Sequence, residues 1–217
     1  MNIDIYQFNL TKPDLDLNSA YNLLDVDEQQ KSDRFVIKNI REKFIFSHAL
    51  LRQVLAQNLN KTPESLQYQY NSNGKPELKN HELHFNLSHS GDLVLIGLCQ
   101  EAEIGVDIEH ARAHDNYQEI AERFFTKTEV AELKTSDDFY RIWTRKEAYL
   151  KMLGHGITFG LDKFSVSAKK DGDDCLISAD QGLMTNCYLG SLKTEENYFA
   201  AFCVENKTKL EVNYERF

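Results

Sequence analysis

The sequence lacks the features that mark membrane-spanning, secreted and zinc-ribbon proteins. It has no run of eighteen apolar residues, so no membrane-spanning helix is predicted. The first residues, MNIDIYQFNL, contain neither a basic segment nor a long apolar one, which argues against a secretory signal peptide. The four cysteines have no CxxC spacing, which argues against a zinc ribbon or a redox motif and favours reduced thiols in the cytoplasm.

Positive charge is also scarce. Lysine and arginine number 25 against 34 aspartates and glutamates, so the formal net charge is −9. This balance disfavours general binding to nucleic acid or to a membrane surface. An anionic ligand would therefore need a local basic site. With 41% hydrophobic and 27% charged residues, the composition is that of an ordinary globular protein with an ample core.

Strand and helix patterns both recur along the chain. Alternating apolar residues predict a strand in 3–10, and apolar residues at helical spacing predict a helix in 31–59. Two strands joined at SHSGD are expected in 83–100, and short alternating runs near the C-terminal end predict an antiparallel sheet. Because both kinds of element occur in 1–103 and in 104–217, we expect an α+β fold with two subdomains of similar size.

The stretch IGVDIE, residues 104–109, alternates apolar and other residues. In a strand, this places the three apolar side chains on one face and directs Asp107 and Glu109 to the other. Two anions on one strand face repel each other, and neither stabilises the strand. The pattern therefore raises the question of what lies between them.

The segment 137–153, DDFYRIWTRKEAYLKML, is the strongest helical pattern in the sequence. Trp143, Glu147 and Lys151 are spaced four residues apart and so share one face. Taken alone, Glu147 and Lys151 are compatible with a surface ion pair. A third carboxylate near the IGVDIE strand would instead complete a site for a hard cation such as Mg²⁺, which favours carboxylates, waters and phosphate oxygens.

Two further segments offer groups for phosphate. NLSHSGD, residues 86–92, brings Ser88, His89 and Ser90 to the end of a strand, which suits either a phosphate cradle or a simple polar turn. A Ser/His hydrolase pair is disfavoured, because adjacent strand residues point to opposite faces and GxSxG is absent. Basic residues in 31–41 predict one cationic stripe on an early helix, either solvated or an anion platform. Its members are Lys31, Arg34, Lys38 and Arg41, with Lys43 on a neighbouring face.

The order of these motifs resembles that of the Sfp-type 4′-phosphopantetheinyl transferases. The motifs are NGKP, NLSHSGD, IGVDIE, RFFTKTE and WTRKEAYLKMLG, and the resemblance runs from about residue 31 to residue 164. The combination of GVDIE with WxxKEAxxK is its most specific part. The resemblance implies a pseudo-twofold α+β fold in which each subdomain has an antiparallel sheet packed on helices. The active site would lie in the cleft between the subdomains.

The implied activity is the transfer of 4′-phosphopantetheine from coenzyme A to a serine of an apo carrier protein, with release of adenosine 3′,5′-bisphosphate. The resemblance places Mg²⁺ and the coenzyme A pyrophosphate against three metal ligands, Asp107, Glu109 and Glu147. It implies catalytic roles for Glu129, Glu147 and Lys151. It implies contacts to the nucleotide phosphates for Lys31, Lys43, Lys75, Ser88, His89 and Lys151.

Two other functions are compatible with the same residues. A Mg²⁺-dependent nucleotide pyrophosphatase would use the three carboxylates without a carrier, and an inactive coenzyme A binding module would have lost turnover. The carrier proteins of this family are acidic helical bundles, so we expect docking on a local apolar patch with nearby cations. The expected surface is 110–125, with Tyr117 and Ile120 as anchors. The chain length, near twice that of the short trimeric carrier synthases, indicates a monomer.

Overall fold

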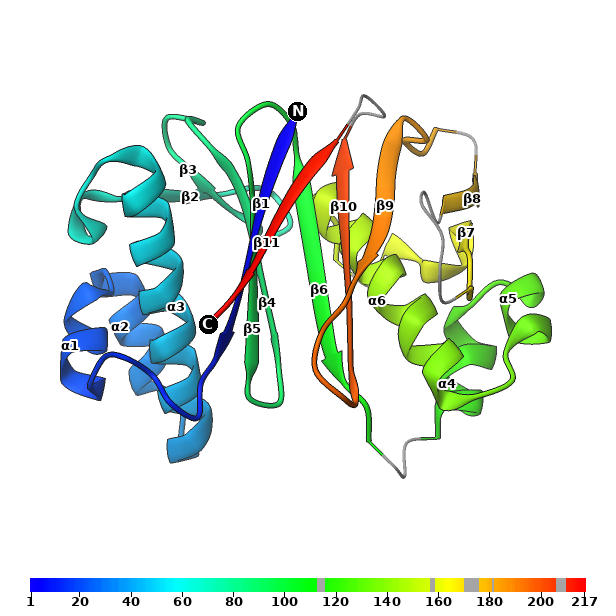
Figure 1. The fold of residues 1–217 in the computed structure, drawn as a ribbon, viewed down its shortest axis with the longest axis horizontal. Coiled ribbons are helices and arrows are strands. Elements are labelled where there is room, and N and C mark those ends of the chain that lie inside the picture. The colour runs from blue at the N-terminus through cyan, green and yellow to red at the C-terminus, as the bar shows by residue number, and fades with distance from the viewer. Residues whose placement is uncertain (113–115, 157–158, 170–175, 181, 206–209) are drawn as a thin grey trace.

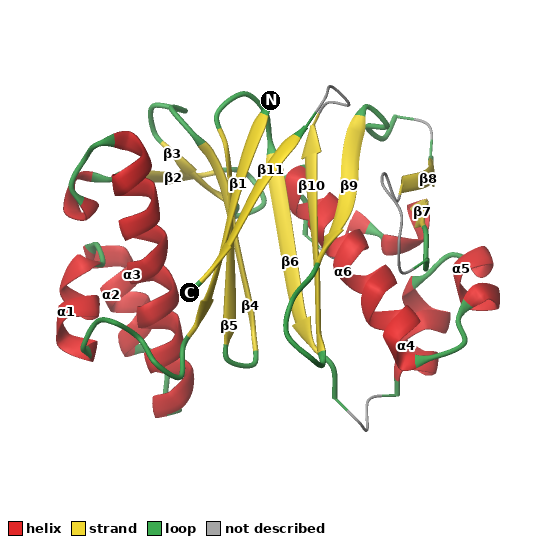
Figure 2. Cartoon of the chain, in the orientation of Figure 1, coloured by secondary structure: helices red, strands yellow, loops and turns green. Residues whose placement is uncertain are grey.

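Two β-sheets lie at the centre of the molecule, and helices cover them on two opposite sides (Figure 1). The computed structural model describes residues 1–112, 116–156, 159–169, 176–180, 182–205 and 210–217. Figure 2 shows the helices in two groups, α1 to α3 on one side of the strands and α4 to α6 on the other. The α+β fold with antiparallel sheets packed on helices is thereby confirmed. None of the helices within the described ranges is both long and apolar enough to cross a membrane.

The N-terminal half builds a sheet of order β11-β1-β5-β4, with α3 packed on its outer face. Its first elements are β1 (Asn2–Asn9), α1 (Leu17–Leu23), α2 (Val26–Asp33), α3 (Lys38–Leu59) and the 3₁₀ turn η1 (Pro63–Ser65). Four strands follow, β2 (Tyr68–Tyr70), β3 (Pro76–Leu78), β4 (His84–Ser90) and β5 (Leu93–Cys99).

The C-terminal half repeats this plan with a sheet of order β6-β10-β9 packed on α6. Its first elements are β6 (Ile104–His110), α4 (Tyr117–Phe124), α5 (Lys127–Glu132), α6 (Ser136–Met152) and the 3₁₀ turn η3 (Leu161–Lys163). Five strands follow, β7 (Phe164–Val166), β8 (Leu176–Ala179), β9 (Cys187–Leu192), β10 (Tyr198–Glu205) and β11 (Glu211–Arg216). In the first sheet β1 pairs with β5, and β5 with β4. In the second sheet β6 pairs with β10, and β10 with β9. The two topologies therefore match, although the sequence shows no repeat.

The last strand crosses back to the first half. β11 pairs in parallel with β1, with Ile3 opposite Val212 and Ile5 opposite Tyr214. A subdomain boundary between residues 103 and 104 therefore stays a prediction, because the strand at the end of the second segment belongs to the sheet of the first.

The apolar face of β6 helps to join the two sheets. Ile104, Val106 and Ile108 are at most 1% exposed and pack with Ile3 of β1 and Leu95 of β5. This confirms the alternation predicted from IGVDIE. Since successive side chains of a strand alternate, the polar residues of β6 face the opposite way, toward α6.

The predicted helix over 31–59 is wrong in one respect. The chain forms two helices, α2 and α3, and leaves the helical conformation between Arg34 and Ile37. Phe35 packs its ring on Phe44 of α3, with 5.3 Å between ring centroids, and this contact requires the chain to turn back. The basic residues of 31–41 are therefore divided between two helices and a connection, and they do not form one helical stripe.

Gly105 sets the distance between β6 and α6. A Cβ atom at this position would lie 2.1 Å from the carbonyl oxygen of Ala148 and 2.3 Å from the amide nitrogen of Met152. Both are backbone atoms of α6 or its last turn and cannot rotate away. The absence of a side chain at Gly105 therefore allows α6 to pack directly on the strand.

We expect Gly105→Ala to lower the free energy of unfolding by about 3 kcal/mol, because overpacking must push the helix off the strand. Gly74→Ala is the matched control. Gly74 has φ of +86° with no atom within 4 Å of an added Cβ, so only backbone strain of about 1 kcal/mol should result. Urea unfolding of both variants measures the difference. Equal losses would show that α6 does not depend on the close approach.

Candidate active site

A seam of side chains connects β4 to β6. Asn86 Oδ1 accepts a hydrogen bond from the Val106 amide at 2.9 Å, and Ser90 Oγ accepts one from the His110 amide at 3.1 Å. Between them, Ser88 Oγ lies 3.4 Å from the amide nitrogen of Ile108. Side chains at every second position of β4 thus accept hydrogen bonds from the amides of β6. In an ordinary sheet, the carbonyl groups of a neighbouring strand would accept these bonds.

The same serines hold the carboxylates of β6. Ser88 Oγ donates to Asp107 Oδ1 at 2.9 Å, and Ser90 Oγ donates to Glu109 Oε2 at 2.7 Å. Lys151 of α6 completes the arrangement, since its ammonium donates to Asp107 Oδ1 at 2.6 Å and to Ser88 Oγ at 2.8 Å. The structure therefore brings together Ser88, Asp107, Glu109 and Lys151, and Ser90 of the same segment joins them through Glu109.

Glu147 lies one helical turn before Lys151 and adds a third carboxylate. It is buried, and its Oε1 atom and Asp107 Oδ2 have no hydrogen-bond partner among the described residues. Burial and the charge of Asp107 raise the pKa of Glu147 to about 7. The same two causes raise the pKa of Glu109. Three acidic groups thus lie close together, and the single positive charge of Lys151 offsets only part of their negative charge.

This donor set fits a hard divalent cation. Two buried carboxylate oxygens without partners are the kind of group that such a cation satisfies. As the side chains lie, no group of three or more His, Cys, Asp or Glu residues within the described ranges has converged to hold a metal ion. The assignment of Asp107, Glu109 and Glu147 as metal ligands therefore stays a prediction.

Cationic side chains lie beside this cluster on the first half of the chain. His89, exposed at the end of β4, loses part of its hydration, and this and the charges of Lys151, His48 and Lys43 lower its pKa. Lys43 of α3 donates to the Gly91 carbonyl at 2.6 Å in the turn that follows. The lowered pKa favours the neutral imidazole, whose N–H can donate a hydrogen bond to an anion.

A cavity of about 540 Å³ lies between α2, α3 and the strands β2 to β4. Lys31, Arg34 and His48 contribute to its lining, and Asn86 and Leu87 connect it to the seam. Asp27, Glu28, Tyr68 and Gly74 also line it. The cavity combines cations with aromatic and backbone surface, which suits a nucleotide better than a wholly apolar ligand.

Lys75, one of the predicted phosphate contacts, is held elsewhere. Its side chain is 8% exposed, and its ammonium donates to Glu103 Oε2 at 2.6 Å. Burial alone would raise the pKa of Glu103, but hydrogen bonds from His84 and Lys75 lower it to about 2. The structure does not bring Lys75 into contact with the carboxylate cluster, and a phosphate would have to compete with a tight ion pair.

Glu129, predicted as a catalytic carboxylate, is also held elsewhere. It is 1% exposed and caps α5, where its Oε2 accepts from the Thr126 amide and hydroxyl at 2.9 Å. Oε2 also lies 2.9 Å from the ammonium of Lys146, a fully buried residue of α6, and Oε1 accepts from the Val166 amide. Both oxygens are occupied, so the geometry favours a structural ion pair over a general base.

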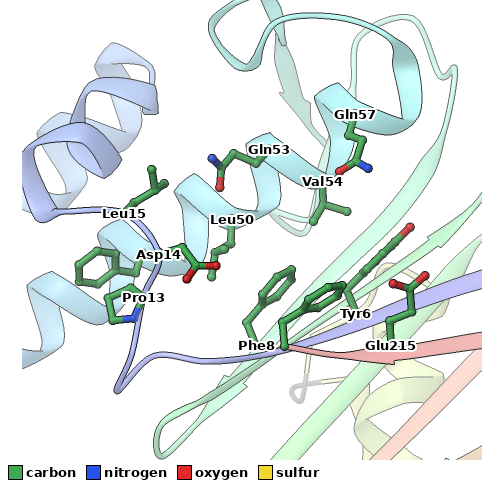
Figure 3. Close-up of a pocket in the computed structure, with 12 residues that line it drawn as sticks. Tyr6, Phe8, Pro13, Asp14, Leu15, Leu50, Gln53, Val54, Gln57 and Glu215 are labelled. Carbon is green, nitrogen blue, oxygen red and sulfur yellow. The ribbon is translucent and has the colours of Figure 1, made fainter.

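A second cavity of about 540 Å³ lies between the loop before α1, helix α3 and the strands β1 and β11 (Figure 3). Tyr6, Phe8 and Leu50 point into it, and Asp14 and Glu215 stand at its edge (Figure 3). None of the predicted site residues lines it. It is therefore separate from the candidate active site.

Comparison with known proteins assigns the family. The profile of the 4′-phosphopantetheinyl transferase superfamily matches residues 103–203, and that of the 4′-phosphopantetheinyl transferase N-terminal domain matches residues 12–101. A putative 4′-phosphopantetheinyl transferase of Synechocystis sp. is 33% identical over 209 residues, which cover 88% of this chain and 84% of the relative. The chain belongs to the 4′-phosphopantetheinyl transferase superfamily.

Two further relatives of the superfamily match most of the chain. The 4′-phosphopantetheinyl transferase HetI of Nostoc sp. is 33% identical over 165 residues, covering 71% of this chain and 70% of its own. The 4′-phosphopantetheinyl transferase Sfp of Bacillus subtilis is 30% identical over 184 residues, covering 82% and 80%. The two profiles together span both halves of the chain.

The surface expected to dock the carrier is described only in part. Tyr117 and Ile120 of α4 are partly buried and pack against the core cluster of α6. Residues 113–115 of the expected surface lie outside the described residues. The docking surface therefore stays a prediction.

Asn86 and Lys146 hold neighbouring groups in place and were not predicted from the sequence, whereas Ser90 was predicted only as part of a phosphate cradle with Ser88 and His89. A signal for Asn86 and Ser90 is present, because N-x-S-x-S in 86–90 directs three polar side chains to one strand face. Nothing in a helical pattern distinguishes Lys146, whose burial depends on contacts with Leu161 and Phe164 from later in the chain.

We expect Glu129→Ala to lower the free energy of unfolding by about 3–5 kcal/mol, because it leaves the buried ammonium of Lys146 unpaired. Glu132→Ala, an exposed position on the same helix, is the control and should change stability little. Urea unfolding at pH 7 measures both. A stable Glu129→Ala variant that has lost only activity would restore the catalytic assignment.

Glu147→Gln should change stability in a pH-dependent way. The folded pKa of about 7 lies above the usual value of 4.5, so between these pH values the folded protein retains a proton that the unfolded chain has released. Stability conferred by neutral Glu147 is therefore lost as pH rises through 7. In the presence of a chelator, the variant should be more stable than the parent at pH 8, by on the order of 2 kcal/mol, and equal to it near pH 4.

Urea unfolding at the two pH values measures this difference. Glu122→Gln, at an exposed position of α4, is the matched control and should show no pH-dependent change. A Glu147→Gln effect of the same size at both pH values would contradict a raised pKa.

Proposed function

We propose that the chain transfers 4′-phosphopantetheine from coenzyme A to a serine of an apo carrier protein, with Mg²⁺ as its metal. The observation that carries this proposal is the buried carboxylate cluster beside Lys151, with two carboxylate oxygens that lack partners, in a member of the transferase superfamily. Asp107, Glu109 and Glu147 would hold the metal. When bound, Mg²⁺ neutralises charge on the pyrophosphate oxygens.

The nucleotide end of coenzyme A fits the cationic cavity. Lys31 and His48 line this cavity, and His89 lies close enough to His48, Lys43 and Lys151 for their charges to lower its pKa. Lysine is a point charge without the bidentate fork of arginine, so position 43 attracts phosphate without fixing its orientation. Ser88 already forms hydrogen bonds with Asp107 and Lys151. Its role is therefore to position these two side chains as well as to contact a phosphate.

Lys151 and Glu147 supply the chemistry on the protein side. In the transfer, the carrier serine oxygen bonds to the β-phosphorus of coenzyme A, and the bond to the bridging oxygen of adenosine 3′,5′-bisphosphate breaks. The ammonium of Lys151 stabilises negative charge that grows on the phosphate oxygens. Because Glu129 has both oxygens occupied, the serine proton passes to Glu147, directly or through a water molecule.

The finer features of the proposal concern partners and location. We propose that the enzyme acts as a monomer in the cytoplasm on an acyl or peptidyl carrier and requires neither nucleic acid nor a membrane. Support for reduced surroundings comes from Cys99, Cys187 and Cys203, which are buried thiols. Cys175 lies outside the described residues.

The decisive test incubates the protein with coenzyme A, Mg²⁺ and a panel of apo carriers. Mass spectrometry should show the gain of one phosphopantetheine group on a carrier, and replacement of the carrier serine by alanine should prevent it. Release of adenosine 3′,5′-bisphosphate is measured in parallel without a carrier. Release at the same rate in both conditions would identify a pyrophosphatase, and binding without any release would identify an inactive module.

Asp107→Asn tests the metal site. We expect transfer to fall by about a hundredfold or more, because the variant retains the shape of the side chain but loses its charge. Mg²⁺ should also stop raising the melting temperature, a measurement independent of activity. Glu101→Gln, at an exposed turn, should preserve both properties. Unchanged stabilisation by Mg²⁺ in Asp107→Asn would remove Asp107 from the metal site.

A further inference from the structure

His48 lines the cavity between α2 and α3 and is absent from the site residues predicted from the sequence. It lies on α3, its side chain is 21% exposed, and it shares the cavity wall with Lys31 and Arg34. Its ring is held on two sides. The ring of Phe44 stacks on it with 4.0 Å between centroids, and its Nδ1 atom lies 2.8 Å from Glu28 Oε1. The ring is therefore fixed in place before any ligand binds.

Glu28 of α2 is an ionised carboxylate in the same wall. It is 3% exposed, and its Oε2 atom accepts from Nε of the fully buried Arg52 at 2.6 Å and from the Asp25 amide at 3.1 Å. Burial alone would raise the pKa of Glu28, but the hydrogen bonds and charges of His48 and Arg52 lower it. Glu28 therefore carries its negative charge at neutral pH.

This pairing fixes which nitrogen of His48 carries the proton. An ionised carboxylate can only accept hydrogen bonds, so Nδ1 of His48 is the donor and Nε2 is left for a ligand. Among the described residues, Nε2 has no hydrogen-bond partner. In the neutral ring, Nε2 is an acceptor and cannot bond to a phosphate oxygen. It becomes a donor only when it takes up a proton.

The charged and titratable groups around His48 come from four elements. They are Asp27, Glu28, Lys31 and Arg34 of α2, Arg52 of α3, Tyr68 and Tyr70 of β2, and His89 of β4. Burial raises the pKa of both tyrosines, which therefore stay neutral. Three lysine and arginine cations outnumber the two carboxylates. This excess of positive charge opposes a further proton on His48 until an anion enters the cavity.

We propose that His48 takes up a proton on Nε2 when a nucleotide phosphate occupies the cavity, and that Glu28 is the positioning residue that fixes the ring and its tautomer. The bound state is then a row of carboxylate, imidazolium and phosphate, in which both negative groups stabilise the positive ring between them. This inference rests on the proposed function, which supplies the nucleotide, and it adds a dependence on pH. Because binding takes up a proton, the affinity falls as pH rises through the range in which the bound ring loses that proton.

Isothermal titration calorimetry of the full chain with adenosine 3′,5′-bisphosphate measures this proton. Titrations at pH 7.5 in two buffers of different ionisation enthalpy give the number of protons taken up per bound nucleotide. His48→Gln retains a hydrogen-bond donor that cannot be protonated, so it should take up about 0.5 proton fewer than the parent. The phosphates of the nucleotide contribute equally to both proteins and cancel in the difference.

His81→Gln is the matched control. His81 lies 4.0 Å from Glu77, and its exposed side chain is not part of the cavity lining. Its replacement should leave proton uptake unchanged. Between pH 6 and pH 8, the dissociation constant of the parent should rise about tenfold more than that of His48→Gln.

Glu28→Gln tests the positioning role. His48 is still present in this variant, but the anion behind its ring is lost, so proton uptake should fall as it does in His48→Gln. A role of Glu28 in folding alone would leave the proton uptake of the folded variant unchanged. His48→Gln preserves the pair of Glu28 with Arg52, so it decides the role of His48 even where Glu28→Gln does not fold.

Each outcome separates the proton uptake from the transfer function. If the nucleotide binds and His48→Gln takes up as many protons as the parent, the role of His48 is overturned and the function stands. If the parent transfers phosphopantetheine but does not bind the nucleotide, the role of His48 is again overturned and the function stands. If the parent neither binds the nucleotide nor transfers phosphopantetheine, both proposals fail.

Discussion

The structure depends on holding three carboxylates beside one ammonium, with Asp107 and Glu147 buried and Glu109 partly buried. Asp107 receives hydrogen bonds from Ser88 and Lys151, but its second oxygen and one oxygen of Glu147 are left without partners among the described residues. Like charges in a region of low dielectric oppose folding. The rest of the fold must therefore hold them in place, through the approach of α6 to Gly105 and through apolar packing on the other face of β6. A cation bound there, as we propose, would relieve this repulsion and so stabilise the fold.

The features that sequence could predict are those that depend on local periodicity or on motifs. Alternation in IGVDIE separated Asp107 and Glu109 from the apolar face, and helical spacing placed Glu147 and Lys151 on one side of α6. Both predictions are confirmed by the structure. The order of the motifs was enough to indicate the superfamily, the α+β fold and the transferase class, which the comparisons bear out. Their roles toward metal and substrate stay predictions.

The features that sequence could not predict depend on contacts between distant segments. Helical periodicity continues through 31–59, yet the packing of Phe35 on Phe44 breaks the helix. A motif identifies Lys75 and Glu129 by their neighbours in the sequence. In the structure, however, Lys75 forms an ion pair with Glu103, and Glu129 forms one with Lys146. Local patterns carry no information on which partner satisfies a charged group. An ion pair between elements can thus change the role that a motif implies.

The seam between β4 and β6 has a consequence for how the family can vary. Two adjacent strands in one sheet are held at about 4.8 Å by backbone geometry that is the same for every residue type. Here the spacing is set by the side chains of Asn86, Ser88 and Ser90. A single substitution can lengthen or shorten such a connector by one bond. The distance between the cavity lined by Asn86 and the carboxylates of β6 can therefore change by substitution without altering the fold of either half.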